Sequence, residues 1–332
     1  MRFAKIFARS NHLAVAGQAD DGDVAIKQIL ELRPDIVLLD LLMPKMDGFG
    51  VLRWAMENHP LPIVVCSSFS DRERVFKALE LGAVDFVLKP TPRSTQMTSR
   101  MEEQMIQRVE EAANAKTASE LKVSPDAKVA LLAAESEALG AQVALVCIAA
   151  STGGPAAIQK LVAGLPHSLS VPMVVVQHMP VGFTRPFAER LNAISHYTVR
   201  EARDQEPIKS KHMYVAPAGA QTTITRTDDG AALSVTGFAS KSLHAPSADA
   251  LFESAAAATG KHTLAIVLTG MGEDGARGAE AVREAGGYVI VESNESAVVF
   301  GMPRSVIERG CANAMLPLSA MPSVLLAYTL KE

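Results

Sequence analysis

Residues 143–162 read VALVCIAASTGGPAAIQKLV, an apolar run that leads into Ser151, two glycines, a proline and a helix-like segment. An apolar run of this length, with no polar alternation, predicts a strand buried on both faces of a parallel sheet. Gly153 and Gly154 allow a sharp turn with N–H groups open toward a pocket, and Pro155 suits the first turn of a helix. The stretch therefore predicts a strand, a tight turn carrying Ser151, and a helix.

The serine at this turn has two interpretations. It is either a structural cap or a nucleophile held at the end of a strand. A phosphate-binding loop is disfavoured, because the GxGxxG pattern and the GK[ST] ending are both absent.

Apolar runs of the same kind alternate with amphipathic segments along both halves of the chain. The expected strands are residues 13–16, 36–39, 63–66, 86–88, 144–149, 173–176, 264–268 and 288–291. This alternation is typical of parallel sheets covered by helices on both faces. The chain has 332 residues, and a chain of this length usually divides into domains because a single hydrophobic core does not grow that large. We therefore expect an α/β protein with two doubly wound, mostly parallel-sheet domains.

The segment from about Thr95 to Gln142 differs in composition, with few large side chains. Met97, Met101, Met105 and Val109 recur every four residues, which predicts a helix that completes the first domain. We expect a first domain over residues 1–112, a partly helical linker over 113–142 and a second domain over 143–332.

The composition of the chain excludes some classes of binding partner. Apolar residues make up 48% and charged residues 20%, and the net charge is -4. Nucleic acid is not an expected partner, since phosphate binding relies on clustered Lys and Arg. No apolar run reaches membrane-spanning length, so we expect a cytoplasmic protein without membrane insertion. Cys66, Cys147 and Cys311 lie in or beside apolar segments, which favours buried thiols over disulfides or metal ligands.

In the first half, three polar side chains follow expected strands. Asp40 ends one strand in DIVLLDLLMPKMDG, Ser67 ends the next in IVVCSS, and Lys89 ends the third in FVLKP. The carboxyl ends of parallel strands meet at one sheet edge, where a carboxylate, a hydroxyl and an ammonium could accept and stabilise a phosphoryl group.

These residues and motifs resemble a two-component receiver domain over roughly residues 13–93. The resemblance implies phosphotransfer from a histidine kinase to Asp40, with Ser67 and Lys89 contacting the phosphoryl group and Asp40 among the ligands of Mg²⁺. Receivers also use a first strand ending in two acidic residues, which has no match here. Asp20 and Asp21 follow the expected second strand and are not substitutes. Two explanations stay open, a true start that lies upstream or a degraded receiver, and for the sequence as given we expect weak Mg²⁺ binding and slow phosphotransfer.

In the second half, a nucleophilic Ser151 would need a base. Among the eight histidines only His178 directly follows a buried strand, in PMVVVQHMP. If that strand is parallel and adjacent to residues 144–149, His178 and Ser151 open into the same crevice.

An acid is also required to orient an imidazole base. The segment TLAIVLTGMGEDGARGAEAV gives another strand followed by Glu273 and Asp274 and then a helix. Either acid could instead cap that helix through its dipole, and local sequence does not separate the two neighbours. The sequence thus offers a Ser…His…acid order at three strand ends.

The motifs AASTGGP, VVQHMP, YVAP, PSAD, LTGMG.DGA and VVFGMP together resemble the catalytic domain of the chemotaxis protein-glutamate methylesterase family, CheB, over about residues 143–328. The resemblance implies that Ser151 is the nucleophile, His178 the general base and then acid, and Asp274 the residue orienting His178. It also implies that the N–H of Met271 helps hold the oxyanion, with Thr152 and Gly153 in the pocket.

The implied reaction is hydrolysis of glutamate γ-methyl esters on the signalling helices of chemoreceptors, with release of methanol, and also deamidation of glutamines there. The esterase itself would need no cofactor. Two alternatives remain at this stage: a non-catalytic signalling scaffold, suggested by the incomplete receiver, and a serine hydrolase acting on another ester.

Overall fold

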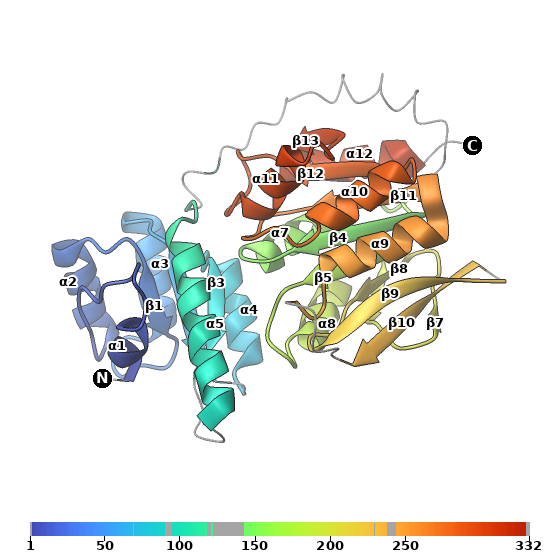
Figure 1. Cartoon of the computed structure of the whole chain (residues 1–332). Helices are drawn as coiled ribbons and strands as arrows, with labels where there is room; N and C mark the ends of the chain where they lie inside the picture. Colours follow the sequence, from blue (N-terminus) through green and yellow to red (C-terminus); the bar gives the residue numbers. More distant parts are fainter. Residues whose placement is uncertain are drawn as a thin grey trace. The chain divides into compact units, whose positions relative to one another are not determined.

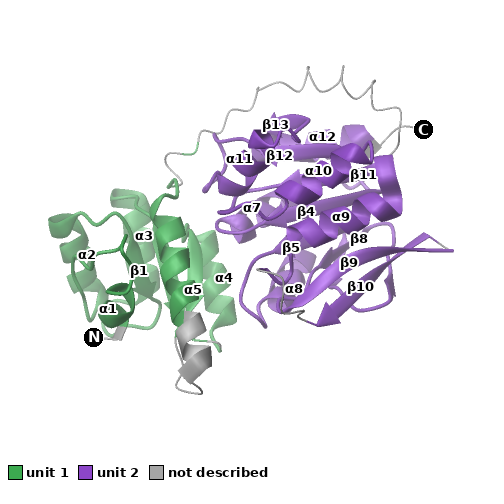
Figure 2. Ribbon diagram, in the orientation of Figure 1, with its two compact units in different colours: residues 1–121 green, residues 122–332 purple. Residues whose placement is uncertain are grey.

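The computed structural model describes residues 2–68, 70–89, 95–117, 121, 143–228, 230–237 and 244–329, with the backbone alone for residues 2 and 95–101. The chain forms two compact units, residues 1–121 and residues 122–332 (Figures 1 and 2). Most of the linker predicted over residues 113–142 lies outside the described residues.

The first unit contains a three-stranded parallel sheet in the order β1-β2-β3. Its strands are β1 (Val37–Asp40), β2 (Ile63–Ser67) and β3 (Asp85–Leu88). Its helices are α1 (Arg2–Phe7), α2 (Gly22–Leu32), α3 (Gly48–Asn58), α4 (Arg72–Glu80) and α5 (Thr95–Ala113). The predicted helix with the four-residue repeat is α5, and its Met105 and Val109 are buried.

The prediction of a strand at residues 13–16 is wrong. This segment has no regular secondary structure, and Val15 is exposed. A strand requires a neighbour to satisfy its backbone N–H and C=O groups. No described strand pairs with this segment or with the free side of β1, so its apolar pattern does not produce a strand.

The second unit is built on a seven-stranded parallel sheet in the order β13-β12-β11-β4-β5-β8-β6. The strands are β4 (Leu145–Ala150), β5 (Met173–Gln177), β6 (Thr198–Glu201), β8 (His212–Val215), β11 (Thr263–Val267), β12 (Tyr288–Glu292) and β13 (Ala314–Leu316). The strand that leads to Ser151, β4, is the central one. This arrangement confirms the predicted fold class.

Helices cover both faces of this sheet. They are α7 (Gly154–Ala163), α8 (Thr184–Ile194), α9 (Ala248–Thr259), α10 (Ala276–Glu284), α11 (Gly301–Glu308) and α12 (Met321–Thr329), with short 3₁₀ turns η1 (Gly260–His262) and η2 (Leu318–Ala320). Figure 1 shows α9 and α10 side by side across β4, β11 and β12.

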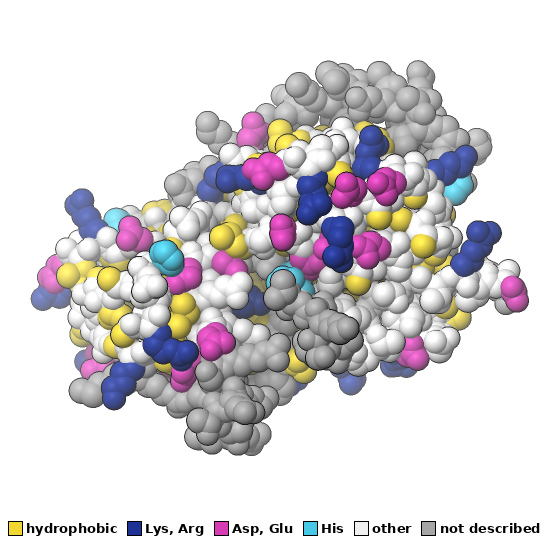
Figure 3. Space-filling view, viewed as in Figure 1, with side chains coloured by type: hydrophobic (Ala, Val, Ile, Leu, Met, Phe, Trp, Pro, Cys, Tyr) yellow, Lys and Arg dark blue, Asp and Glu magenta, His cyan; other side chains and the backbone are white. Residues whose placement is uncertain are grey.

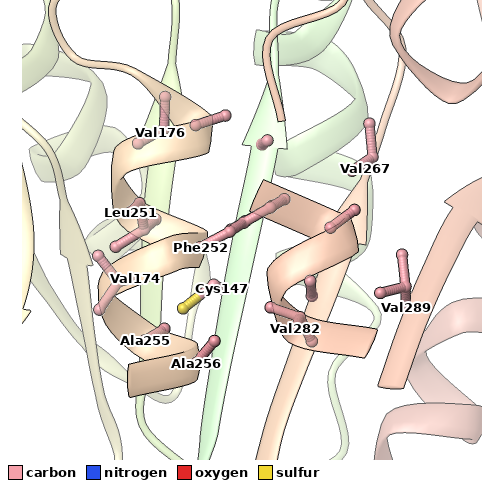
Figure 4. Close-up of a cluster of buried hydrophobic side chains, with 14 of the residues drawn as sticks. Cys147, Val174, Val176, Leu251, Phe252, Ala255, Ala256, Val267, Val282 and Val289 are labelled. Carbon is pink, nitrogen blue, oxygen red and sulfur yellow. The ribbon is translucent and has the colours of Figure 1, made fainter. Parts of the chain in front are cut away.

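A cluster of buried apolar side chains lies between these helices and the sheet. Phe252 of α9 and Val282 of α10 pack against Cys147, Val267 and Val289 of the strands (Figure 4). All three cysteines are buried free thiols, as predicted. Burial raises the pKa of Cys66 to about 12, so that thiol stays neutral.

A second, antiparallel sheet in the order β7-β10-β9 was not predicted. Its strands are β7 (Glu206–Pro207), β9 (Ala220–Thr227) and β10 (Gly230–Gly237).

Basic and acidic side chains are interspersed over the face shown in Figure 3. Within the described ranges, no helix combines the length and apolarity needed to cross a bilayer.

Candidate active site

Ser151 and His178 lie at the same edge of the main sheet because β4 and β5 are parallel neighbours. The two strands end in register, with Ala150 opposite Gln177. The N–H of His178 donates to the carbonyl of Ala150 at 3.0 Å and so continues the ladder by one step. The structure thus brings together the two residues that the sequence predicts as nucleophile and base.

The loop after β11 borders Ser151 on its other side. The N–H of Ser151 donates to the carbonyl of Thr269 at 3.0 Å. A Cβ placed on Gly270 would lie 2.8 Å from the Cβ of Ser151, so only glycine permits this approach. Met271 follows directly, with its side chain 43% exposed. The predicted oxyanion donor therefore sits in the segment beside the predicted nucleophile.

His178 is held by Asp274. Its Nε2 lies 2.8 Å from Oδ2 of Asp274, which is buried, while His178 is partly buried. An ionised carboxylate only accepts hydrogen bonds, so Nε2 carries a proton, and whenever the ring is neutral its lone pair is on Nδ1. The imidazole of His244 stacks on that of His178, with 4.5 Å between ring centroids and 6° between planes.

Asp274 is also anchored at the first turn of α9. Its carboxylate accepts hydrogen bonds from Oγ of Ser247 at 2.8 Å and from the N–H groups of Ala248 at 2.7 Å and Asp249 at 3.1 Å. Burial alone would raise the pKa of Asp274, but the bond and charge of His178 and the two N–H groups hold it below its ordinary value. Asp274 is therefore ionised at neutral pH. Glu273, its sequence neighbour, is exposed.

Asp249 braces the Asp274 loop in return. Its Oδ1 accepts the N–H of Gly275 at 2.9 Å and that of Gly278 at 2.8 Å, at the start of α10. Asp274, which precedes α10, therefore caps α9, and Asp249, which lies in the first turn of α9, caps α10. This exchange fixes the distance between α9 and α10 at the end where His178 is bound.

Gln177 joins the backbones of the two predicted catalytic residues. Its Nε2 donates to the carbonyls of Ser151 at 2.9 Å and His178 at 3.1 Å, and its side chain is buried. A Cβ on Gly154 would lie 2.0 Å from Oε1 of Gln177. The second glycine of the STGGP turn is therefore required for Gln177 to reach both carbonyls.

The remaining predicted pocket residues lie in the turn itself. Gly153 has φ of +79°, a conformation that favours glycine, and it is the N-cap of α7. Thr152 is fully buried, and its carbonyl accepts a hydrogen bond from Oγ1 of Thr269 at 2.9 Å. Because Ser151 stands at the N-terminus of α7, the helix dipole favours negative charge developing there.

In the first unit, the predicted residues Asp40, Ser67 and Lys89 also meet at one sheet edge. Nζ of Lys89 lies 2.5 Å from Oδ2 of Asp40, and Oδ1 of Asp40 accepts the N–H of Leu42 at 3.0 Å. Ser67 ends the middle strand, and its carbonyl accepts the N–H of Lys89 at 2.8 Å. The structure thus places these three predicted residues at one sheet edge, with the ammonium of Lys89 on the carboxylate of Asp40.

A Mg²⁺ site at this edge is incomplete. Mg²⁺ requires near-octahedral oxygen coordination, and Asp40 supplies one carboxylate. Asp21 is engaged elsewhere, because it caps α2 through the N–H of Val24 and pairs with Lys45 at 2.5 Å. In the described part of the chain, no three His, Cys, Asp or Glu side chains are placed to share a metal ion. The residues present do not fit the ion.

The second unit thus presents a serine, a histidine and an aspartate at one edge of a doubly wound sheet, the arrangement used by serine hydrolases. Comparison with known families is more specific. Residues 146–325 match the CheB methylesterase model, and residues 1–102 match the response regulator receiver domain model.

Named relatives, matched over about nine tenths of their length, give the same result. The chain is 38% identical over 336 residues to protein-glutamate methylesterase/protein-glutamine glutaminase 3 of Geobacter sulfurreducens, covering 96% of this chain and 91% of that one. It is 43% identical over 320 residues to protein-glutamate methylesterase/protein-glutamine glutaminase 6 of Anaeromyxobacter dehalogenans, covering 95% and 88%.

A solved structure agrees. The crystal structure of the Thermotoga maritima CheB methylesterase catalytic domain aligns with a TM-score of 0.54 at 39% identity, covering 56% of this chain and 98% of that one. The chain belongs to the CheB methylesterase family, which confirms the resemblance read from its motifs.

Several residues around the site were missed at the sequence level, namely Gln177, His244, Ser247, Asp249 and Thr269. For Ser247 a signal existed, since a serine directly before an apolar helical run is a typical N-cap. The others act through contacts between segments far apart in the chain, which a one-dimensional pattern does not reveal.

Proposed function

We propose that this protein hydrolyses glutamate γ-methyl esters on the signalling helices of chemoreceptors through Ser151, His178 and Asp274. The observation that carries the proposal is the bond between His178 Nε2 and Asp274 Oδ2, formed at the sheet edge where Ser151 also lies. The names of the relatives, protein-glutamate methylesterase/protein-glutamine glutaminase, support a glutamate methyl ester as the substrate.

The chemistry follows from the arrangement. Nδ1 of His178 takes the proton of the Ser151 hydroxyl as its oxygen attacks the ester carbonyl, and the charge of Asp274 stabilises the imidazolium that forms. Backbone N–H groups near Met271, Thr152 and Gly153 stabilise the tetrahedral oxyanion. The imidazolium then protonates the departing methoxide oxygen, so that methanol leaves and an acyl-enzyme remains.

Water completes the cycle. His178 removes a proton from water, which attacks the acyl-enzyme and releases the glutamate carboxylate. The same steps with ammonia as leaving group give glutamine deamidation. The esterase reaction calls for no cofactor, and receptors with cytoplasmic signalling helices would place it in the cytoplasm.

For the first unit, Asp40 is the proposed phosphoacceptor from a histidine kinase, with Ser67 and Lys89 contacting the phosphoryl group. The Asp40–Lys89 pair and the match to the receiver family support this assignment. The incomplete ligand set favours slow phosphorylation. Incubation with acetyl phosphate and Mg²⁺ followed by mass spectrometry tests it, and a rapid, complete phosphoryl addition on Asp40 would contradict the expected slow rate.

The decisive experiment on the esterase is Ser151→Ala, with exposed Ser168→Ala as the control. Methanol release from methylated receptor membranes should disappear in the first variant and persist in the second, with unchanged thermal unfolding in both. Retained release by Ser151→Ala would reject the nucleophile assignment. Wild-type activity on small generic esters alone would favour a different hydrolase, and no activity on either would favour a scaffold.

A further inference from the structure

Glu292 is a fully buried carboxylate at the end of β12, two strands away from the nucleophile strand β4. Its Oε2 accepts the backbone N–H of Thr269 at 2.8 Å, and its Oε1 accepts the hydroxyl of Ser296 at 2.9 Å. A carboxylate is costly to bury without a specific partner. Its position therefore calls for an explanation.

The partner it serves is Thr269. Strands β11 and β12 pair in register as far as Val267 and Val291. Beyond Glu292 the chain follows β13, since the N–H of Ser293 donates to the carbonyl of Leu316 at 2.7 Å. The backbone ladder thus ends before Thr269, whose N–H is buried. The side chain of Glu292 supplies the acceptor that the ladder no longer provides.

Thr269 in turn grips the Ser151 turn at two points. Its carbonyl accepts the N–H of Ser151 at 3.0 Å, and its hydroxyl donates to the carbonyl of Thr152 at 2.9 Å. The same hydroxyl accepts the N–H of Val299 at 2.9 Å. Any shift of Thr269 would be transmitted to the backbone that carries the Ser151 hydroxyl.

We propose that Glu292 is a positioning residue for Ser151, acting through the hydrogen bond to Thr269. The proposal rests on the proposed role of Ser151 as nucleophile. Glu292 holds Thr269 from the β12 side, while Gln177 holds the carbonyl of Ser151 from the β5 side. The central turn is fixed by a buried side chain from each flank of β4.

Both protonation states of Glu292 can serve this role. Burial raises its pKa to about 7, while Ser296, Thr269 and the charge of Lys160 act in the opposite direction. The protonated acid retains an acceptor oxygen for Thr269 and gains a donor for Ser296. Glutamine is the neutral isostere of that form. The acceptor, rather than the charge, is therefore the property that positions Ser151.

Full-length Glu292→Gln and Glu292→Met test this, with exposed Glu295→Gln as the matched control. Methionine keeps length and volume but has no strong acceptor. We expect Glu292→Met to lower kcat for methanol release from methylated receptor membranes by about tenfold or more with KM little changed, since small displacements of a nucleophile are costly. Glu292→Gln should keep most of the rate, and Glu295→Gln all of it.

Amide hydrogen exchange supplies a second readout that needs no substrate. Exchange at Thr269 and Ser151 should accelerate in Glu292→Met and stay near wild type in Glu292→Gln. If Glu292→Met does not fold, Thr269→Val removes the hydroxyl that contacts Thr152 and Val299, and it should lower kcat in the same way.

The proposal would be overturned if Glu292→Met, or Thr269→Val in its place, kept the wild-type kcat and hydrogen exchange. It would also be overturned if Glu292→Gln and Glu292→Met lost kcat equally. Absence of methanol release from the wild type would instead reject the proposed function, and the exchange data would then decide the positioning role separately.

Discussion

Two buried carboxylates at one sheet edge have pKa values that are shifted in opposite directions. Asp274 accepts hydrogen bonds from two N–H groups of α9 and from His178, and its pKa is lowered despite burial. Glu292 has one N–H and one hydroxyl, and its pKa is raised. Hydrogen bonds to the charged form outweigh desolvation only in the first case. Asp274 thus remains a permanent charge for His178, whereas Glu292 titrates near neutral pH.

This difference predicts a pH-dependent stability. The pKa of Glu292 is about 7 in the folded chain against an ordinary value of 4.5, so the folded state binds its proton more tightly. Its contribution to the free energy of unfolding is full below about pH 4.5 and is lost as pH rises through 7. Glu292→Gln should remove this loss and be more stable than wild type at pH 8, by on the order of 3 kcal/mol.

Calorimetric unfolding of the full chain between pH 5 and pH 8 measures the effect. The advantage of Glu292→Gln should grow with pH across this range, and exposed Glu295→Gln should follow the wild type. A constant difference at every pH would mean that Glu292 does not change its protonation state on folding.

At the scale of elements, the paired helix starts of α9 and α10 form a brace behind His178. Asp249 accepts the buried N–H groups of Gly275 and Gly278, next to Asp274. Asp249→Ala leaves both donors without this acceptor, so we expect destabilisation of about 1–3 kcal/mol. The rate of ester hydrolysis should fall as well, because the Asp274 loop loses its anchor.

Asp249→Asn separates the two effects in this prediction, since asparagine keeps an oxygen acceptor. It should retain more stability and activity than Asp249→Ala in thermal unfolding and methanol release. Alanine at exposed Asp228 should change neither. If Asp249→Ala matched wild type in both measurements, the brace would have no role.

Elements also explain what the sequence could reveal. Long apolar runs predict β4, β5, β11 and β12, and polar residues at their ends predict which side chains share an edge. The hairpin of β9 and β10 was missed because TTITRT and ALSVT are rich in threonine and serine and lack a strong apolar face. Residues 13–16 show the converse, since an apolar segment without a pairing partner is not a strand.

The site was predictable only in part for the same reason. Ser151, His178 and Asp274 each follow a strand, so topology alone places them together. Glu292 reaches Ser151 through Thr269, and this depends on where the β11–β12 ladder stops. Sequence patterns predict where the strands lie, but they do not predict the residue at which the backbone pairing between two strands ends.

At the scale of the whole molecule, every contact described for the proposed esterase site lies within the second unit. The sheet of β4 to β13, the cluster around Phe252 and the bonds of Asp274 all fall between residues 143 and 329. A chain fragment that keeps its own core and its buried hydrogen bonds should fold as a unit. Residues 143–332 alone should therefore unfold cooperatively and release methanol within a few-fold of the full chain.

The measurement compares this fragment with the full chain by calorimetry and by methanol release, using the fragment with Ser151→Ala as the blank. Cooperative unfolding with full activity would show that the predicted boundary at residue 143 separates a complete catalytic domain. Cooperative unfolding with activity lost would mean that the first unit contributes directly to catalysis. A fragment without a cooperative transition would show that the boundary cuts into the core, since a fold that keeps its own core should not lose cooperativity when a separate unit is removed.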